Sequence, residues 1–165
     1  MLKINDYIMY GTTGVCQVTD IKSEQFLNDQ PQDYYVLNPV YTEHTTIMVP
    51  VESTQINARS LHSKEEVSSF IEKMPSKELF WIDDVRERNL IFRSMIKKMD
   101  CESLITLIKS IYHHKNKEGS STKKINKNDE DIMKLAEHLL NEEFAMILGI
   151  EPEEVTDYIL EQVAE

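Results

Sequence analysis

Residues 7–21, YIMYGTTGVCQVTDI, join two runs of strand-forming side chains through a cluster of turn residues. The runs at 7–10 and 15–21 are rich in β-branched and aromatic residues, and Gly11-Thr12-Thr13-Gly14 separates them. Similar runs follow at 34–37 and 45–51. Four or five short strands within the first sixty residues predict a small β-barrel or a strongly bent sheet.

Two details refine this β module. Asn28-Asp29-Gln30-Pro31 indicates a hairpin loop, and Pro50 is expected at a strand end or an edge because it has no N–H to donate to a ladder. A module of this size buries little apolar surface. It is therefore expected to depend on a neighbouring domain or a partner.

The pattern changes to helical spacing after Ile56. Residues that start or stop helices recur through the rest of the chain, and they predict about five α-helices, one of them spanning residues 129–148. The expected caps and breakers are Ser63 with Glu66, Pro75, Ser76, Asp100, Gly149 and Pro152. The predicted fold class is α+β, with a β module at 1–60 and a compact helical domain at 61–165.

The composition is that of a soluble globular protein, with 41% hydrophobic and 28% charged residues among 165. No apolar run reaches the length of a membrane helix, and the N-terminus lacks the layout of a signal peptide. A cytoplasmic location without membrane attachment is therefore expected. Cys16 and Cys101 are expected to be free thiols in such a reducing compartment.

Charge is distributed unevenly along the chain, whose net value is −11. Residues 85–128 carry eleven basic and four acidic side chains, a net of +7, while the segments before and after carry −7 and −11. This asymmetry is typical of a polyanion-binding face flanked by acidic segments. A solvated helical surface that is merely basic explains it equally well.

The segment 76–99 is expected to form the helix that carries this basic character. At 100° per residue, Val85, Phe92, Ile96 and Met99 form one apolar stripe. Three cations fall within about 40° of one another beside that stripe, an arrangement suited to tracking a phosphate backbone. They are Arg86, Arg93 and Lys97, and further lysines follow at 109, 115, 117, 123 and 124.

Trp81, the only tryptophan, allows two interpretations. If the helix is regular through it, the ring joins the apolar stripe as ordinary core. Alternatively, it is an aromatic wedge that packs on an exposed base or a distorted minor-groove step. The adjacent Asp83 and Asp84 disfavour close phosphate contact at that point.

No catalytic or metal-binding motif is evident. The histidines at 44, 62, 113, 114 and 138 form no pair at metal-ligand spacing, and no phosphate loop, nucleophile elbow or cysteine pair occurs. Cys101 lies near a helix start, but no histidine is close to it in sequence. The sequence therefore predicts a protein that is not an enzyme, with no metal, cofactor or small-molecule substrate.

The order and spacing of several segments resemble the CarD/CdnL family of bacterial transcription regulators. The resemblance covers nearly the whole chain, although none of its short motifs is specific alone. The segments are 5–10 (NDYIMY), Gly14-Val15 with Val18, 35–37 (YVL), 46–51 (TIMVPV), Trp81 with 86–88 (RER), Ala136-Glu137, 143–145 (EFA) and 148–150 (LGI).

The resemblance implies a Tudor-like or SH3-like N-terminal module that binds the β subunit of RNA polymerase. It further implies a helical C-terminal domain that contacts promoter DNA, wedges the minor groove with Trp81 and stabilises the open complex without reading sequence. The protein would then be cytoplasmic and associated with the bacterial nucleoid. The implied polymerase-binding residues are Glu24, Ile47, Met48, Val49 and Pro50. The implied DNA-binding residues are Trp81, Arg86, Arg88, Arg93, Lys97, Lys123 and Lys124.

Two departures from the family pattern qualify these roles. Some relatives have basic residues where this chain has Glu24 and Met48, so a charge-pair account of the polymerase contact does not transfer. Some also have basic residues directly after the tryptophan, where this chain has Ile82-Asp83-Asp84. DNA binding by the isolated protein is therefore expected to be weak and to depend on polymerase for effective concentration.

Two other functions remain open from the sequence. In the first, the protein is an interaction adaptor with no DNA role, whose β module binds a partner while the helices act as a scaffold. In the second, the small barrel binds RNA, which is disfavoured because the cations are few there and concentrate outside the β segment.

Overall fold

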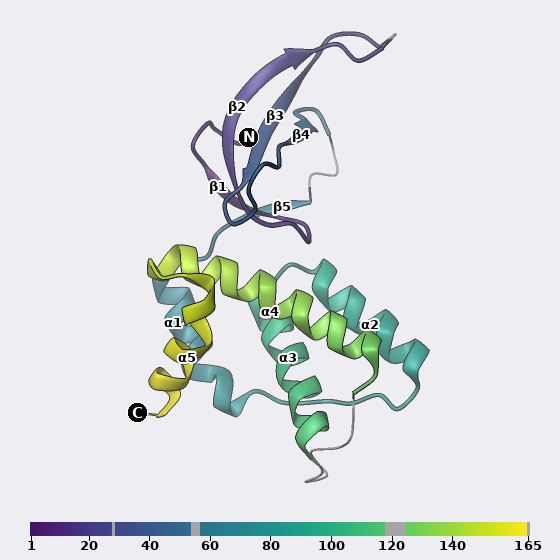
Figure 1. The fold of residues 1–165 in the computed structure, drawn as a ribbon, viewed down its shortest axis with the longest axis vertical. Coiled ribbons are helices and arrows are strands. Elements are labelled where there is room, and N and C mark those ends of the chain that lie inside the picture. Colours follow the sequence, from purple (N-terminus) through teal and green to yellow (C-terminus); the bar gives the residue numbers. More distant parts are fainter. Residues whose placement is uncertain (28, 54–56, 118–124, 165) are drawn as a thin grey trace. The chain divides into compact units, whose positions relative to one another are not determined.

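The computed structural model describes residues 1–165 except 28, 54–56, 118–124 and 165. The chain divides into two compact units, Met1–Leu61 and His62–Glu165. The first unit is built from strands and the second from helices, as Figure 1 shows. The predicted α+β class is confirmed.

The N-terminal unit is one antiparallel sheet of five strands in the order β4-β3-β2-β1-β5. The strands are β1 (Tyr7–Tyr10), β2 (Gly14–Glu24), β3 (Gln32–Pro39), β4 (Ile47–Pro50) and β5 (Ala58–Ser60). Since β4 and β5 end the order without pairing to each other, the sheet of the described residues is open. The predicted closed barrel is therefore not confirmed.

Glycines and a bulge shape the central strands. Gly11 and Gly14 have φ of 47° and 107° in the turn between β1 and β2, conformations that favour glycine. The register between β2 and β3 shifts between Val18 and Asp20, which is the mark of a β-bulge. The extra residue bends β2 and increases its twist. Pro50 lies at the end of the edge strand β4, as predicted.

The core of this unit comes from alternate residues of neighbouring strands, with Leu2, Tyr10 and Val51 packing at its margin. Its buried members are Ile8, Cys16, Val18, Tyr35, Leu37 and Val49. Cys16 has no exposed surface. One small apolar layer thus holds the sheet together.

The described residues of the C-terminal unit form five α-helices and two short 3₁₀ helices. They are α1 (Lys64–Lys73), η1 (Met74–Ser76), α2 (Val85–Lys97), α3 (Cys101–Asn116), α4 (Lys127–Leu148), η2 (Pro152–Glu154) and α5 (Val155–Ala164). The 22-residue α4 packs along α3 and also touches α2 and α1 (Figure 1). Phe92 and Phe144 are fully buried between these helices. Within the described part of the chain, no helix combines the length and apolarity needed to span a membrane.

Most predicted helix ends are confirmed. Ser63 and Glu66 form the capping box: the Glu66 N–H donates to Ser63 Oγ (3.1 Å) and the Ser63 N–H donates to Glu66 Oε2 (2.7 Å). That backbone hydrogen bond lowers the pKa of Glu66 from its ordinary value. Asp100 caps α3, and Gly149 ends α4 in the left-handed conformation at φ 72°.

The start of α2 differs from the prediction. Ser76 caps no helix; its hydroxyl donates to the Lys73 carbonyl (3.1 Å), and residues 77–84 are not helical. Asp84 is the N-cap instead and accepts a hydrogen bond from the Glu87 N–H (2.8 Å). Trp81 therefore precedes the helix rather than belonging to it.

The predicted apolar stripe of α2 is only partly correct. Phe92 and Ile96 are buried, but Val85 is 41% exposed and Met99 lies beyond the end of the helix. Helix α2 begins at Val85, so residues 76–84 are not part of it. On the buried face of α2, Arg88 lies beside Phe92 and Ile96.

Candidate functional surfaces

Trp81 lies in the segment before α2 and is half-buried. Its ring stacks on the His114 ring of α3 with centroids 3.6 Å apart and planes 4° apart. The guanidinium carbon of Arg88 lies 4.4 Å from the Trp81 ring centroid, a cation–π contact. The Phe92 ring meets it edge-on at 6.2 Å. Trp81 is thus held by His114, Arg88 and Phe92 of the helical unit while part of its surface stays exposed.

A surface cavity of about 230 Å³ borders the tryptophan. Leu79, Phe80 and Trp81 line it from one segment, and His113, His114 and Lys117 line it from the end of α3. This cavity leaves part of the indole reachable from solvent. An aromatic ring, two histidines and a lysine around one hollow form a surface on which a flat or anionic group could rest.

Arg88 was expected to contact DNA, and its placement does not fit that role. The side chain is 5% exposed and forms two parallel bonds to the buried Asp129, from Nε to Oδ1 (3.1 Å) and from Nη2 to Oδ2 (2.7 Å). Its Nη1 donates to the carbonyls of Ile82 (2.8 Å) and Asp83 (3.3 Å). Arg88 thus fixes the segment that carries Trp81 to α4.

The other predicted cations of α2 are placed as the helical wheel required. Arg86, Arg93 and Lys97 are all exposed, and their spacing along α2 puts them on one side of the helix. We call these three residues the α2 cationic row. The remaining predicted DNA-binding residues, Lys123 and Lys124, lie outside the described residues.

The predicted polymerase-binding residues lie on strand β4 and at the end of strand β2. Ile47, Met48, Val49 and Pro50 constitute β4, an edge strand that pairs with β3. Val49 is 7% exposed and belongs to the core, whereas Ile47 and Met48 are half-buried.

Glu24, the last residue of β2, pairs with Gln32 of β3. Two residues further along β3, Tyr34 pairs with Pro50 of β4. It lies 3.8 Å from Lys22 in an exposed ion pair. Glu24 and Pro50 therefore mark the same end of the sheet.

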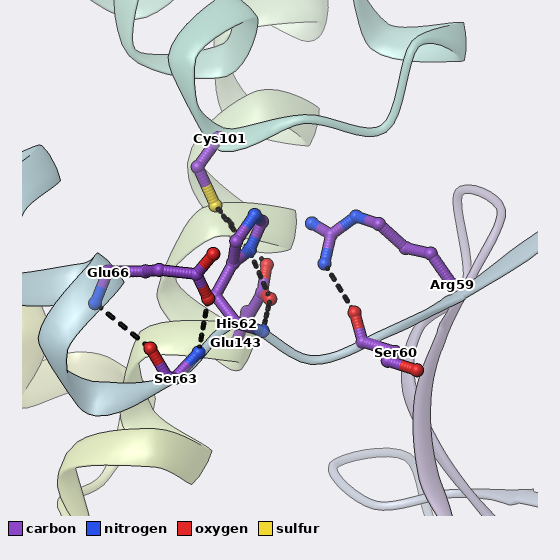
Figure 2. A network of polar contacts seen from close by, with 7 residues as sticks. All are labelled: Arg59, Ser60, His62, Ser63, Glu66, Cys101 and Glu143. Carbon is purple, nitrogen blue, oxygen red and sulfur yellow. Dashed lines mark hydrogen bonds and ion pairs between the residues drawn. The ribbon is translucent and has the colours of Figure 1, made fainter.

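One cluster in the helical unit was missed at the sequence level. His62, Cys101 and Glu143 come from the residue before the α1 cap, the first residue of α3, and α4, and Figure 2 shows their side chains pointing at one another. The His62 Nδ1 lies 2.8 Å from Glu143 Oε1 and 3.6 Å from Cys101 Sγ. The thiol also donates to Glu143 Oε2 (3.3 Å). Sequence spacing could not reveal the cluster because its members lie 39 and 42 residues apart.

Comparison with known proteins gives one family. Residues 2–59 match the model described as the CarD-like/TRCF RID domain, a region that includes β1 to β4 and most of β5. The N-terminal unit therefore carries a CarD-like/TRCF RID domain, which confirms the resemblance for this part of the chain. A search among curated proteins gave no match.

Proposed function

We propose that this protein is a non-enzymatic transcription regulator. In this proposal it docks on the β subunit of RNA polymerase, contacts promoter DNA without reading its sequence, and prolongs the life of the open complex. The observation that carries the proposal is the match of residues 2–59 to the CarD-like/TRCF RID domain. The protein would then act in the bacterial cytoplasm, at the nucleoid.

The docking half of the proposal rests on the β unit, which we take to be a Tudor-like module. An edge strand offers unpaired backbone groups to a partner strand, and β4 is such an edge. The half-buried Ile47 and Met48 add apolar surface beside it. Charge pairing is not required for this contact, which suits a chain that has Met48 where some relatives are basic.

A single charge on β4 is expected to weaken polymerase binding. Met48→Asp places a carboxylate, opposite in sign to the basic residue of some relatives, in an apolar contact and should raise the Kd for RNA polymerase at least about tenfold, since desolvating an unpaired charge costs more than 1.4 kcal/mol. Surface plasmon resonance with the full chain measures it. The matched control is Ile4→Asp, which changes an apolar residue outside β4 that is 49% exposed. Equal loss in both variants would remove β4 from the interface.

The DNA half of the proposal rests on the helical unit. The α2 cationic row supplies three exposed charges for phosphates. Trp81 borders a cavity through which an unstacked base could approach the indole, and stacking on a ring face would displace His114 or Arg88. Asp84 is the N-cap of α2, and its carboxylate accepts a hydrogen bond from the Glu87 N–H while keeping its charge. Phosphate contact is therefore expected further along α2, away from Asp83 and Asp84.

Removing the indole is expected to shorten the life of the open complex. Stacking of a base on an aromatic ring contributes about 1–3 kcal/mol, so Trp81→Ala should reduce the lifetime at least about fivefold, and Trp81→Phe should retain part of it. Promoter dissociation kinetics with polymerase measure this effect. Circular dichroism of each variant is the control, because lost helical signal would show that the ring is needed for folding rather than for DNA.

A second candidate function is an interaction adaptor with no DNA role. It is favoured by one observation: the Trp81 ring already contacts Arg88 and His114 within the helical unit. Under this alternative Trp81→Ala leaves open-complex lifetime unchanged while Met48→Asp still weakens docking.

A further inference from the structure

Three potential metal ligands converge on one point in the helical unit. One ligand atom from each of His62, Cys101 and Glu143 lies within 4.8 Å of the other two. The three residues belong to separate elements, so their meeting is a product of the tertiary fold (Figure 2). Cys101 and Glu143 have no exposed surface, and the His62 side chain is 18% exposed.

The arrangement is unsuited to nucleophilic catalysis. An imidazole that relays a proton uses one ring nitrogen toward the nucleophile and the other toward the orienting carboxylate. Here the same atom, His62 Nδ1, faces both the Cys101 thiol and the Glu143 carboxylate. Convergence of one nitrogen, one sulfur and one oxygen on a single point is instead the arrangement of a metal site.

Two of the three ligand separations suit a tetrahedral zinc ion, and the third, from His62 Nδ1 to Glu143 Oε1, is a hydrogen-bond distance of 2.8 Å that must lengthen when the ion binds. With Zn–S of about 2.3 Å and Zn–N of about 2.0–2.1 Å, tetrahedral angles separate sulfur and nitrogen by roughly 3.5–3.6 Å. The observed separation of Cys101 Sγ and His62 Nδ1 is 3.6 Å. The sulfur to Glu143 Oε2 distance is 3.3 Å, close to the roughly 3.6 Å expected with a carboxylate ligand.

A second layer of contacts already orients two of the ligands. The His62 backbone N–H donates to Glu143 Oε1 (2.9 Å), which leaves Oε2 toward the thiol. The His62 ring packs edge-on against Phe70, with centroids 5.0 Å apart and planes at 90°. Groups that fix the ligands in this way are what a metal site requires beyond the ligands themselves.

We propose that His62, Cys101 and Glu143 bind one Zn²⁺ ion, with water in the fourth position. Binding replaces the Cys101 thiol proton, which passes to solvent, and requires the His62 ring proton to reside on Nε2 so that Nδ1 can coordinate. Affinity therefore falls as the pH is lowered. The ion would join the first residue of the helical unit to α3 and α4.

Access to the site follows from its surroundings. A cavity of about 490 Å³ is lined by Phe70, Met95 and Asp100 among others, and it adjoins Cys101, which itself has no exposed surface. The partial exposure of His62 leaves room for the water ligand. A site with three protein ligands and one exchangeable position resembles open zinc sites more than closed structural ones.

Cobalt titration of the reduced, metal-free full chain tests the proposal. Co²⁺ bound by a thiolate gives a near-ultraviolet charge-transfer band, expected here at one equivalent and lost on adding Zn²⁺. Cys101→Ser should abolish the band, and His62→Gln should weaken Co²⁺ binding at least tenfold. Cys16→Ser, which removes the other buried cysteine, should leave the band unchanged.

Thermal unfolding gives an independent readout. Zn²⁺ should raise the Tm of the wild-type and Cys16→Ser proteins in a concentration-dependent manner and leave that of Cys101→Ser unchanged, since only a ligand that binds the folded state shifts the transition. If Cys101→Ser fails to fold, His62→Gln, checked by circular dichroism, carries the test. The proposal is overturned if the wild-type chain gives no band, or if the folded variants bind cobalt as the wild type does.

Discussion

Arg88→Met is expected to destabilise the helical unit by about 3–5 kcal/mol, the usual cost of leaving one partner of a buried ion pair alone. The substitution keeps a long apolar stem but leaves the Asp129 carboxylate, 2% exposed, without its two guanidinium bonds. The carbonyls of Ile82 and Asp83 lose a donor as well. Urea unfolding followed by circular dichroism at the helical signal measures the loss.

Arg93→Met on the exposed side of α2 is the matched control and should change stability by no more than about 0.5 kcal/mol. The double variant Arg88→Met/Asp129→Leu should recover much of the lost stability, because no unpaired buried charge remains. Recovery cannot be complete while the two carbonyls lack their donor. A stable Arg88→Met protein that has lost only DNA binding would return Arg88 to the DNA-contacting set.

Reversing the charges of the α2 cationic row is expected to weaken the association of the protein with DNA strongly. Each phosphate contact steepens the dependence of log K on log salt by about 0.9, so Arg86→Glu/Arg93→Glu/Lys97→Glu should flatten the slope by roughly 2.7. At about 0.1 M salt this corresponds to an affinity loss on the order of 10²–10³-fold. Because the isolated protein is expected to bind weakly, binding is measured on promoter DNA in the presence of polymerase across a salt series.

The control reverses three exposed lysines elsewhere in the helical unit, Lys64, Lys73 and Lys134, and changes net charge by the same amount. It should leave the salt slope within the error of the wild type. If both triple variants weaken binding equally, net charge rather than the position of the row accounts for the effect, and the row is a solvated surface.

Local signals predicted most of the helical unit. Ser63 with Glu66, Asp100 and Gly149 each stabilise a helix end through contacts within a few residues, so their roles could be read from neighbours in the chain. The strands also followed local composition. Whether the sheet closes into a barrel could not be predicted in this way, because closure depends on pairing between distant strands rather than on the residues within each strand.

The errors around Trp81 have a tertiary cause. Ser76 and Asp84 are both plausible N-caps, and the helical wheel offered no reason to prefer the later one. Arg88 holds the carbonyls of the segment before α2 while it pairs with Asp129, 41 residues away. The same limit concealed the His62, Cys101 and Glu143 cluster, whose members share no local pattern.

The two edge strands of the sheet also bear on whether copies of the protein associate with one another. Long exposed edge strands invite pairing between copies and lead to aggregation. Here one edge, β4, has four residues and ends in Pro50, and the other, β5, has three. A strand added from outside would find only a few backbone groups and one position with no donor, which disfavours stacking of further copies. The short edges thus suit a sheet that pairs with one partner rather than with copies of itself.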